Sequence, residues 1–200
     1  MTSPNKNLKY LSIEALLQLI ESPHREICER ILADNRALFE TARGSTFNHQ
    51  TWDGGYIDHI TDCLNIAYQL YGHLCRFGRT VPFSVSDALL VLFIHDLEKP
   101  WKIQVNTDGS VSLRDGLQTK EDFARFRDEK LAEYGLSLNA VQANAFKYVE
   151  GEYKDYSSKH RVMNELAAFC HMVDTWSARG WYDYPKVDDE WPGATRFRTA

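Results

Sequence analysis

Apolar residues recur at intervals of three and four over much of the chain, which is the spacing that places them on one face of an α-helix. The segment from about residue 55 to 77 shows this period at Ile57, Ile60, Leu64, Ala67, Tyr71 and Leu74. Similar segments run over about residues 23–43, 120–134, 137–149 and 159–179. The pattern therefore predicts a chain built mainly from amphipathic helices.

One stretch departs from this amphipathic pattern. Seven apolar residues run without a break from Ala88 to Ile94, and His95 and Asp96 follow them directly. A helix that is apolar on every side is normally buried. We therefore predict a central helix, capped by Ser84, whose last turn carries His95 and Asp96 to the edge of the core, with Pro100 ending the segment. A carboxylate is costly to bury there unless another group pairs with it.

The apolar period changes from helical to alternating only after Pro100. Apolar residues at Ile103, Val105, Val111 and Leu113 alternate with polar residues on either side of Asp108-Gly109. An Asp-Gly pair between two alternating runs is typical of a β-hairpin. The sequence shows no repeated strand-helix-strand pattern. No Gly-x-Gly-x-x-Gly motif or P-loop follows a predicted strand. The expected fold class is therefore all-α: a helical bundle with a short hairpin inserted at about residues 102–114.

The length of 200 residues suits a single domain. We expect its core at about residues 12–180, after a polar arm at 1–11 and before an aromatic tail at 181–200 that contains Trp181, Tyr182, Tyr184 and Trp191. The net charge of −5 argues against a protein that coats a long nucleic acid, because such proteins carry a strongly basic surface. A homo-oligomer remains open.

Two features of the sequence indicate a cytoplasmic protein that does not contact a membrane. The N-terminal residues contain no apolar signal segment, and no apolar run approaches the roughly 20 residues that span a bilayer. The four cysteines show no Cys-x-x-Cys spacing, and each lies within a helical pattern; they are Cys28, Cys63, Cys75 and Cys170. We expect them to be small buried apolar residues in a reducing compartment.

Histidine and aspartate residues in separate helices suggest a metal site. In chain order they are His59, then the adjacent His95 and Asp96, then Asp174. Two imidazoles and two carboxylates form a mixed nitrogen and oxygen set that suits a borderline or hard divalent ion. Each residue alone fits a core histidine or a surface aspartate equally well. The adjacent pair at the end of an apolar helix, with partners in matching contexts, favours the metal site.

Four features of these segments resemble the HD-domain superfamily of metal-dependent phosphohydrolases, over roughly residues 45–180. They are His59 after Gly54-Gly55 in a segment that begins Asn48-His49, the His95-Asp96 pair, Lys99 three residues beyond that pair, and Asp174 followed by Ser177-Ala178-Arg179. The segment around His59 is most similar to HD-type 3′–5′ exoribonucleases. The final segment is similar to the end of HD nuclease domains.

The resemblance implies an HD-like helical bundle that holds one divalent ion on His59, His95, Asp96 and Asp174. Mn²⁺, Mg²⁺, Ni²⁺, Co²⁺, Fe²⁺ and Zn²⁺ all fit this set, so the sequence does not select the metal. The implied reaction is hydrolysis of a phosphoester or phosphoanhydride of a nucleotide, or of a short nucleic-acid end, by metal-activated water. The implied partner is thus a small phosphorylated substrate.

Roles for the other residues follow from their places beside these ligands. The resemblance makes Lys99 a ligand of the substrate phosphate and places His49 in the active site, in an acid–base or substrate-binding role. The candidate catalytic residues are Asp96, Lys99, His49 and Asp62, and the candidate substrate-binding residues are Lys99, Arg179 and His49. Asp62 follows His59 by one helical turn, where it can orient His59 or act as a general base.

The sequence leaves an alternative open for each of these residues. Lys99 also fits a solvated cation at a helix end, His49 a surface loop residue, and Asp62 a solvated helix residue. Arg179 fits an ion pair with an acidic neighbour as well as it fits a phosphate ligand.

Dinuclear HD enzymes, including di-iron oxygenases, add two histidines spread between the HD pair and the final aspartate. Here only His160 and His171 lie in that window, both close to Asp174, although Glu150 or Glu152 could bind a second ion. We therefore favour one metal ion and disfavour an oxygenase. The main rival is a non-catalytic nucleotide-sensing or partner-binding module that keeps the metal for structure.

Overall fold

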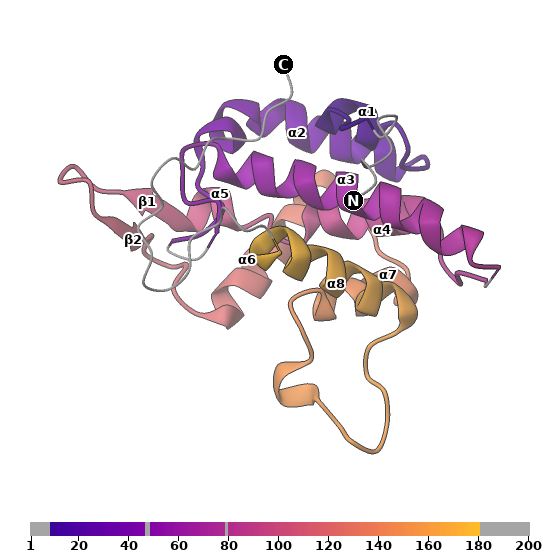
Figure 1. The fold of residues 1–200 in the computed structure, drawn as a ribbon. Helices are drawn as coiled ribbons and strands as arrows, with labels where there is room; N and C mark the ends of the chain where they lie inside the picture. The colour runs from indigo at the N-terminus through magenta and orange to yellow at the C-terminus, as the bar shows by residue number, and fades with distance from the viewer. Residues whose placement is uncertain (1–8, 47–48, 79, 181–200) are drawn as a thin grey trace, which may run out of the picture.

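The computed structural model describes residues 9–46, 49–78 and 80–180. Over these residues the chain is mainly α-helical, with one small two-stranded antiparallel sheet (Figure 1). This confirms the predicted all-α class with a short hairpin. The proposed aromatic tail and most of the polar arm lie outside the described residues.

The helices and strands follow one another in the order in which the sequence predicts them. The helices are α1 (Ile13–Leu17), α2 (His24–Thr41), α3 (Gly55–Arg76), α4 (Val85–Ile94), α5 (Lys99–Lys102), α6 (Lys120–Tyr134), α7 (Ala140–Tyr148) and α8 (Glu165–Arg179), with a short 3₁₀ turn, η1 (Tyr153–Asp155). The strands β1 (Ile103–Val105) and β2 (Val111–Leu113) pair Ile103 with Leu113 and Val105 with Val111.

Helix α4 lies at the centre of the bundle. It contacts α2, α3, α7 and α8, and α3 and α8 also contact each other (Figure 1). Residues Ala88 to Ile94 are each at most 1% exposed, and they join one continuous cluster of buried apolar side chains from most of the other helices. The predicted central buried helix is therefore confirmed, and its C-terminal end is where the site residues lie.

Reciprocal hydrogen bonds fix the start of α4. The Ser84 hydroxyl accepts from the Asp87 backbone N–H, while the Asp87 carboxylate accepts from the backbone of Ser84. The second carboxylate oxygen of Asp87 accepts a 2.7 Å hydrogen bond from the side-chain amide of Gln142, which is itself buried in α7. The side chain of Gln142 also caps its own helix by accepting from the backbone N–H of Asn139. One amide thus links the start of α7 to the start of the central helix.

The central helix ends just before the His95-Asp96 pair, which was predicted to lie in its last turn. The helix ends at Ile94, His95 is its C-cap, and residues 95–98 form a turn before the short helix α5. Pro100 gives the physical reason, because a proline ring clashes with the carbonyl of the fourth residue before it, here Asp96, and a proline has no N–H to continue the ladder. Pro100 instead occupies the first turn of α5, where a missing N–H costs nothing.

Two further expectations need correction. The last helix begins at Glu165 rather than near residue 159, because the Asn164 side chain caps it by accepting from the Ala167 N–H. Residues 150–164 before it form a projecting loop that contains η1 (Figure 1). All four cysteines are free thiols, but only Cys28, Cys63 and Cys170 are buried; Cys75 is exposed on α3. None of the described helices has the length and apolarity needed to cross a membrane.

We predict that Gln142→Ala lowers the free energy of unfolding by about 1–3 kcal/mol, because it removes a helix cap and leaves an Asp87 oxygen without its donor. Urea denaturation followed by circular dichroism measures the change. The matched control is Gln118→Ala at an exposed position, expected to change stability by no more than about 0.5 kcal/mol. Equal losses in the two variants would contradict the proposed link between α7 and α4.

Candidate metal centre

The four predicted metal ligands come together at one place in the bundle. His59 lies in α3, His95 and Asp96 follow α4, and Asp174 lies in α8. One ligand atom from each residue lies within 4.8 Å of the others, and no other such group of histidine, cysteine and acidic side chains exists among the described residues. This buried group could bind a metal ion.

Two imidazole nitrogens face two carboxylate oxygens across this group. The Nε2 atom of His59 lies 3.4 Å from Asp96 Oδ2 and 3.2 Å from Asp174 Oδ1. The Nε2 atom of His95 lies 3.1 Å and 3.4 Å from the same two oxygens. The side chains of both histidines are 0% exposed, that of Asp96 is 2% exposed, and that of Asp174 is 18% exposed. The group is therefore least buried on the side of Asp174.

A hydrogen bond to the backbone settles which nitrogen of His95 faces the carboxylates as a ligand. Its Nδ1 lies 2.7 Å from the carbonyl oxygen of Leu92, one turn earlier. A carbonyl can only accept, so Nδ1 carries a proton and donates. Nε2 is therefore the atom whose lone pair is available to a metal ion. This kind of outer hydrogen bond is the usual way in which a metal-binding histidine is oriented.

A serine that the sequence analysis gave no role orients His59. The Nδ1 of His59 lies 3.1 Å from the hydroxyl oxygen of Ser177, and this hydroxyl donates a 2.8 Å hydrogen bond to Asp62. Because the only hydroxyl proton of Ser177 goes to Asp62, its oxygen accepts from His59 Nδ1. His59 thus also presents Nε2 to the site. Asp62 is linked to His59 through Ser177, while its predicted role as a general base stays a prediction.

The residues present fit a bound cation. His95 Nε2 and Asp96 Oδ2 are buried and make no hydrogen bond within the described part of the chain, although the Lys99 ammonium lies against Asp96 Oδ2. Buried polar atoms of native proteins nearly always have a partner. Two lone pairs on nitrogen that face two carboxylates repel them unless a positive charge lies between, and a divalent ion with nitrogen and oxygen ligands supplies it.

Protons supply this positive charge when no metal is present. Burial by itself would lower the pKa of His95, but the nearby Asp96 and Asp174 outweigh it and raise this pKa well above its ordinary value. Burial would likewise raise the pKa of Asp174, but the two neighbouring histidines outweigh it and hold this pKa far below its usual range. The pKa of Asp96 is lowered in the same way, against burial, by the charges of His95 and Lys99.

Lys99 lies at the metal group and is not a solvated cation. It is only 9% exposed, and its ammonium pairs with Asp96. Burial would lower the pKa of Lys99, but Asp96 and Asp174 outweigh it and raise this pKa, so the side chain is charged. The turn after α4 places it there, because α5 starts at Lys99 and its backbone N–H bonds to the Asp96 carbonyl at 3.0 Å.

A second charged cluster, which the sequence did not predict, contacts the turn that follows α4. Arg127 of α6 donates a 2.8 Å hydrogen bond to the backbone carbonyl of His95 and lies 3.6 Å from the buried Glu98. Lys102 completes the cluster with a 2.6 Å ion pair to Glu98. The signal in the sequence was Glu98 itself, a carboxylate directly after the apolar helix. The sequence could not identify Arg127 as its partner, because the contact joins residues that are far apart in the chain.

His49 is half-buried and lies beside the site. Its ring centroid lies 4.8 Å from that of His59. Burial, followed by the positive charge of Lys99, lowers the pKa of His49 to about 2. Its neighbour Gln50 is fully buried and was missed by the sequence analysis. Asn48, which contributed to the resemblance, lies outside the described residues.

Two glycines allow this loop to approach the start of α3. Gly54 has a φ of +79°, which suits glycine, and the Gly55 N–H bonds back to the Trp52 carbonyl. A Cβ atom on Gly55 would lie 1.8 Å from the backbone oxygen of Gln50. The Gly54-Gly55 pair therefore lets the backbone of Gln50, and with it His49, lie against the helix that carries His59.

The remaining candidate residues do not join the four ligands. Arg179 is exposed and follows Ser177 by two residues, which is about 200° around the helix, so it faces away from His59. Glu150 lies 3.8 Å from Arg127, and burial together with the charge of Asp96 raises its pKa. Glu152 accepts a 3.4 Å hydrogen bond from the backbone N–H of Met163. The roles of Arg179 and of a second ion near Glu150 or Glu152 stay predictions.

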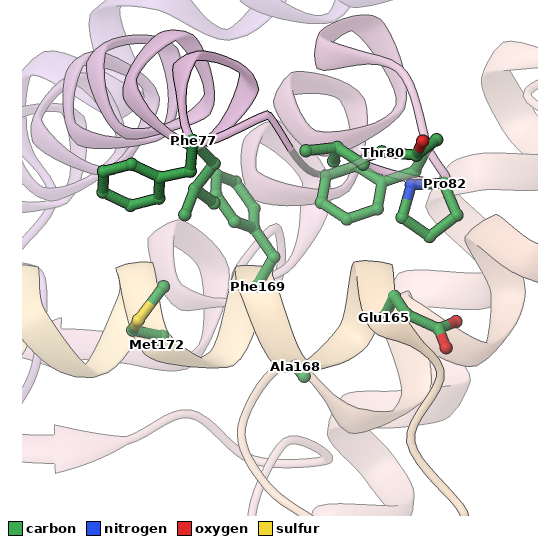
Figure 2. A pocket seen from close by; sticks show the side chains of 10 residues that line it. Phe77, Thr80, Pro82, Glu165, Ala168, Phe169 and Met172 are labelled. Carbon is green, nitrogen blue, oxygen red and sulfur yellow. The ribbon is translucent and has the colours of Figure 1, made fainter.

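A separate apolar pocket of about 470 Å³ lies between the end of α3, the segment before α4 and α8. Figure 2 shows Phe77, Phe169 and Met172 among the side chains that line it, with Glu165 as its one charged residue. None of the residues that we assign to the metal group takes part in it. The pocket therefore has no evident connection with the chemistry of the metal group.

No protein-family model, curated protein or solved structure matches this chain significantly. The resemblance to HD domains thus rests on the motif residues, and the metal group rests on the geometry of His59, His95, Asp96 and Asp174. These four side chains come from three different helical segments, and their placement is a property of the tertiary fold. Two imidazole nitrogens and two carboxylate oxygens are thereby brought within reach of one ion.

We predict that Ser177→Ala weakens the binding of Co²⁺ by roughly 10- to 100-fold, because His59 loses the hydrogen bond that fixes its ring. Isothermal titration calorimetry measures the affinity. The matched control is Ser86→Ala, which removes a buried serine hydroxyl that accepts from the Glu21 N–H, away from the metal group. The control is expected to bind Co²⁺ like the wild type; equal affinities in both variants would refute the role of Ser177.

We also predict that Co²⁺ binding at pH 7 releases about one proton, because the metal-free protein keeps the raised-pKa imidazole of His95 protonated on the ligand atom Nε2. Calorimetry in buffers of different ionisation enthalpy counts the proton. The affinity should rise by about tenfold per pH unit until the pKa of His95 is passed. A pH-independent affinity between pH 6 and 8 would contradict this assignment.

Proposed function

We propose that this chain is an HD-type metal-dependent phosphohydrolase that cleaves a phosphoester or phosphoanhydride of a nucleotide or of a short nucleic-acid end. The observation that carries the proposal is the convergence of two imidazole nitrogens and two carboxylate oxygens beside a buried lysine ammonium. His59, His95, Asp96 and Asp174 would hold one divalent ion. Lys99 stands where a phosphate beside that ion would need a countercharge.

The number and type of donors support a catalytic site. Four protein donors leave positions open on a six-coordinate ion, whereas structural zinc sites are closed by four ligands that are mostly thiolates. A divalent ion, when bound, lowers the pKa of a water molecule and polarises phosphoryl oxygens. The greater exposure of Asp174 gives this group a side on which a substrate can approach.

The charge of Lys99 supports a phosphorylated substrate. An ammonium donates to phosphate oxygens through charge-assisted hydrogen bonds, which are about twice as strong as neutral ones. Without substrate, Lys99 pairs with Asp96, so its charge is already neutralised by a metal ligand. A divalent ion would take over this role at Asp96 and leave the ammonium for the phosphate. His49 lines the same wall of the group, beside His59.

The overall charge favours a small substrate over a long polymer. The chain has 23 basic and 28 acidic residues, and proteins that follow a nucleic-acid backbone need a basic surface along it. A mononucleotide or a short oligonucleotide end needs only the countercharge at the site itself. We therefore place a nucleotide first and a short nucleic-acid end second.

A second candidate is a non-catalytic module that senses a nucleotide or binds a partner and keeps the metal for structure. The complete burial of both histidine side chains also fits this role. A di-iron oxygenase ranks lower, because no histidine beyond His59 and His95 joins the metal group within the described residues. Two irons per purified chain would favour the oxygenase instead.

The test is a screen of phosphoesters with Mn²⁺, Mg²⁺, Co²⁺, Ni²⁺, Fe²⁺ or Zn²⁺ added, which compares nucleotides with short oligonucleotides. We expect wild-type turnover on at least one nucleotide and the loss of both metal binding and turnover in Asp96→Ala. Wild-type rates in Asp96→Ala would refute the mechanism. The absence of turnover on every compound, with metal bound, would favour the non-catalytic module.

Lys99→Met separates the phosphate ligand from the metal ligands. It removes the ammonium but keeps an apolar stem, so we expect metal binding to persist and kcat/KM to fall by about 10- to 100-fold. The matched control is Lys130→Met, because Lys130 is also partly buried and pairs with Glu133, outside the metal group. Loss of metal binding in Lys99→Met would show that the lysine supports the ligands and does not bind the substrate.

A further inference from the structure

Ser177 supports two different histidines with two different atoms. Its hydroxyl accepts from His59, as described above, and its backbone carbonyl accepts a 3.3 Å hydrogen bond from the side-chain amide nitrogen of Gln50. The amide oxygen of Gln50 in turn contacts Nδ1 of His49. A chain of contacts therefore runs from α8 through a buried glutamine to the ring of His49.

This chain of contacts fixes the orientation of each group in turn. The Ser177 carbonyl can only accept, so the NH₂ group of Gln50 faces it and the amide oxygen faces His49. That oxygen also can only accept, so Nδ1 of His49 carries a proton and donates it. A neutral imidazole carries only one ring proton. The remaining nitrogen, Nε2, therefore has a lone pair and no proton.

The backbone around Gln50 is held as firmly as its side chain. The Gly44 N–H donates a 2.8 Å hydrogen bond to the Gln50 carbonyl, and a Cβ atom on Gly44 would lie 2.9 Å from the Gln50 Cβ. The backbone N–H of His49 donates a 2.8 Å hydrogen bond to the Ser45 hydroxyl. Such contacts on both sides keep the amide of Gln50 aimed at His49.

We propose that Gln50 is a positioning residue that fixes His49 as a hydrogen-bond acceptor, so that the ligand group which His49 meets is an O–H or N–H donor. Phosphate oxygens are acceptors and would be repelled by the lone pair on Nε2, so Lys99, and not His49, serves the phosphate. In the proposed phosphohydrolase, on which this part rests, the donor is either the attacking water or a hydroxyl of the substrate next to the scissile phosphate.

The first test uses the metal-free protein and needs no activity. Nitrogen chemical shifts in NMR spectra report which ring nitrogen carries the proton, and a His49→Ala spectrum assigns the signals. We expect protonated Nδ1 and unprotonated Nε2 in the wild type. Gln50→Glu keeps the acceptor and should keep this tautomer, whereas Gln50→Met, which retains the Cβ and Cγ atoms, should lose it. A proton on Nε2 in the wild type, or an unchanged tautomer in Gln50→Met, would overturn the proposal.

Metal binding provides the matched comparison. Ser177→Ala cuts the link to His59 but keeps the backbone carbonyl that holds Gln50. Gln50→Met cuts the link to His49 and the bond to the Ser177 carbonyl, but keeps the Ser177 hydroxyl that holds His59. We therefore expect Co²⁺ affinity to fall in Ser177→Ala and to stay at the wild-type value in Gln50→Met. The tautomer of His49 should be unchanged in Ser177→Ala and lost in Gln50→Met. Equal loss of Co²⁺ affinity in both variants would mean that Gln50 supports the metal ligands, which would also overturn the proposal.

The kinetic test applies to any nucleotide that the screen finds to be a substrate. His49→Ala and Gln50→Met should each lower kcat by about 10- to 100-fold, and the double variant should lose no more than His49→Ala alone, because both act through one ring. If the fold-losses in kcat of the two single variants multiply in the double variant, a positioning role for Gln50 is contradicted.

Paired ribonucleotide and 2′-deoxyribonucleotide substrates identify the source of the donor. A penalty for His49→Ala that is the same on both substrates assigns the donor to water, and a penalty confined to the ribonucleotide assigns it to the 2′-hydroxyl. If no phosphoester is cleaved, the proposed function fails, while the NMR and Co²⁺ tests still decide the role of Gln50.

Discussion

This structure depends on the close contact of two buried histidines with two carboxylates at the end of the central helix. Such a group is unfavourable without positive charge, and the fold supplies that charge from His95, when it is protonated, and from Lys99. A divalent ion is the alternative that satisfies all four ligand atoms together. The deep burial of the apolar part of α4 gives the group its low-dielectric setting, because His95 and Asp96 follow that helix directly.

The supporting hydrogen bonds show how the fold orients these side chains as candidate metal ligands. A backbone carbonyl orients His95, and Ser177 with Asp62 orients His59. Each bond leaves Nε2 as the free ligand atom, so the tautomers are fixed before a metal binds. Arg127 adds support from α6 by holding the carbonyl of His95. Pre-orientation of this kind reduces what has to be rearranged when an ion binds.

Ser177 makes two separate sets of contacts, one with its hydroxyl and one with its backbone carbonyl. One set, through the Ser177 hydroxyl, concerns the candidate metal ligand His59. The other, through its carbonyl and Gln50, concerns His49, which holds no place among the metal ligands. Donors and acceptors are thereby divided around the group: Lys99 donates and His49 accepts. A nucleotide beside a metal ion presents both acceptor oxygens and donor hydroxyls, so this division suits such a ligand.

The sequence by itself determined the helical class, the hairpin, the central buried helix and the four candidate metal ligands, because each depends on local period or on motif spacing. It placed His95 and Asp96 in the last turn of the central helix, whereas the helix ends at Ile94 and the pair lies in the turn that follows. Only the tertiary structure decided how the ligands are held: Ser177, Gln50 and Arg127 act on residues far away in the chain. Hydrogen bonds between distant segments leave no period in a sequence, so these roles emerge only when the helices pack.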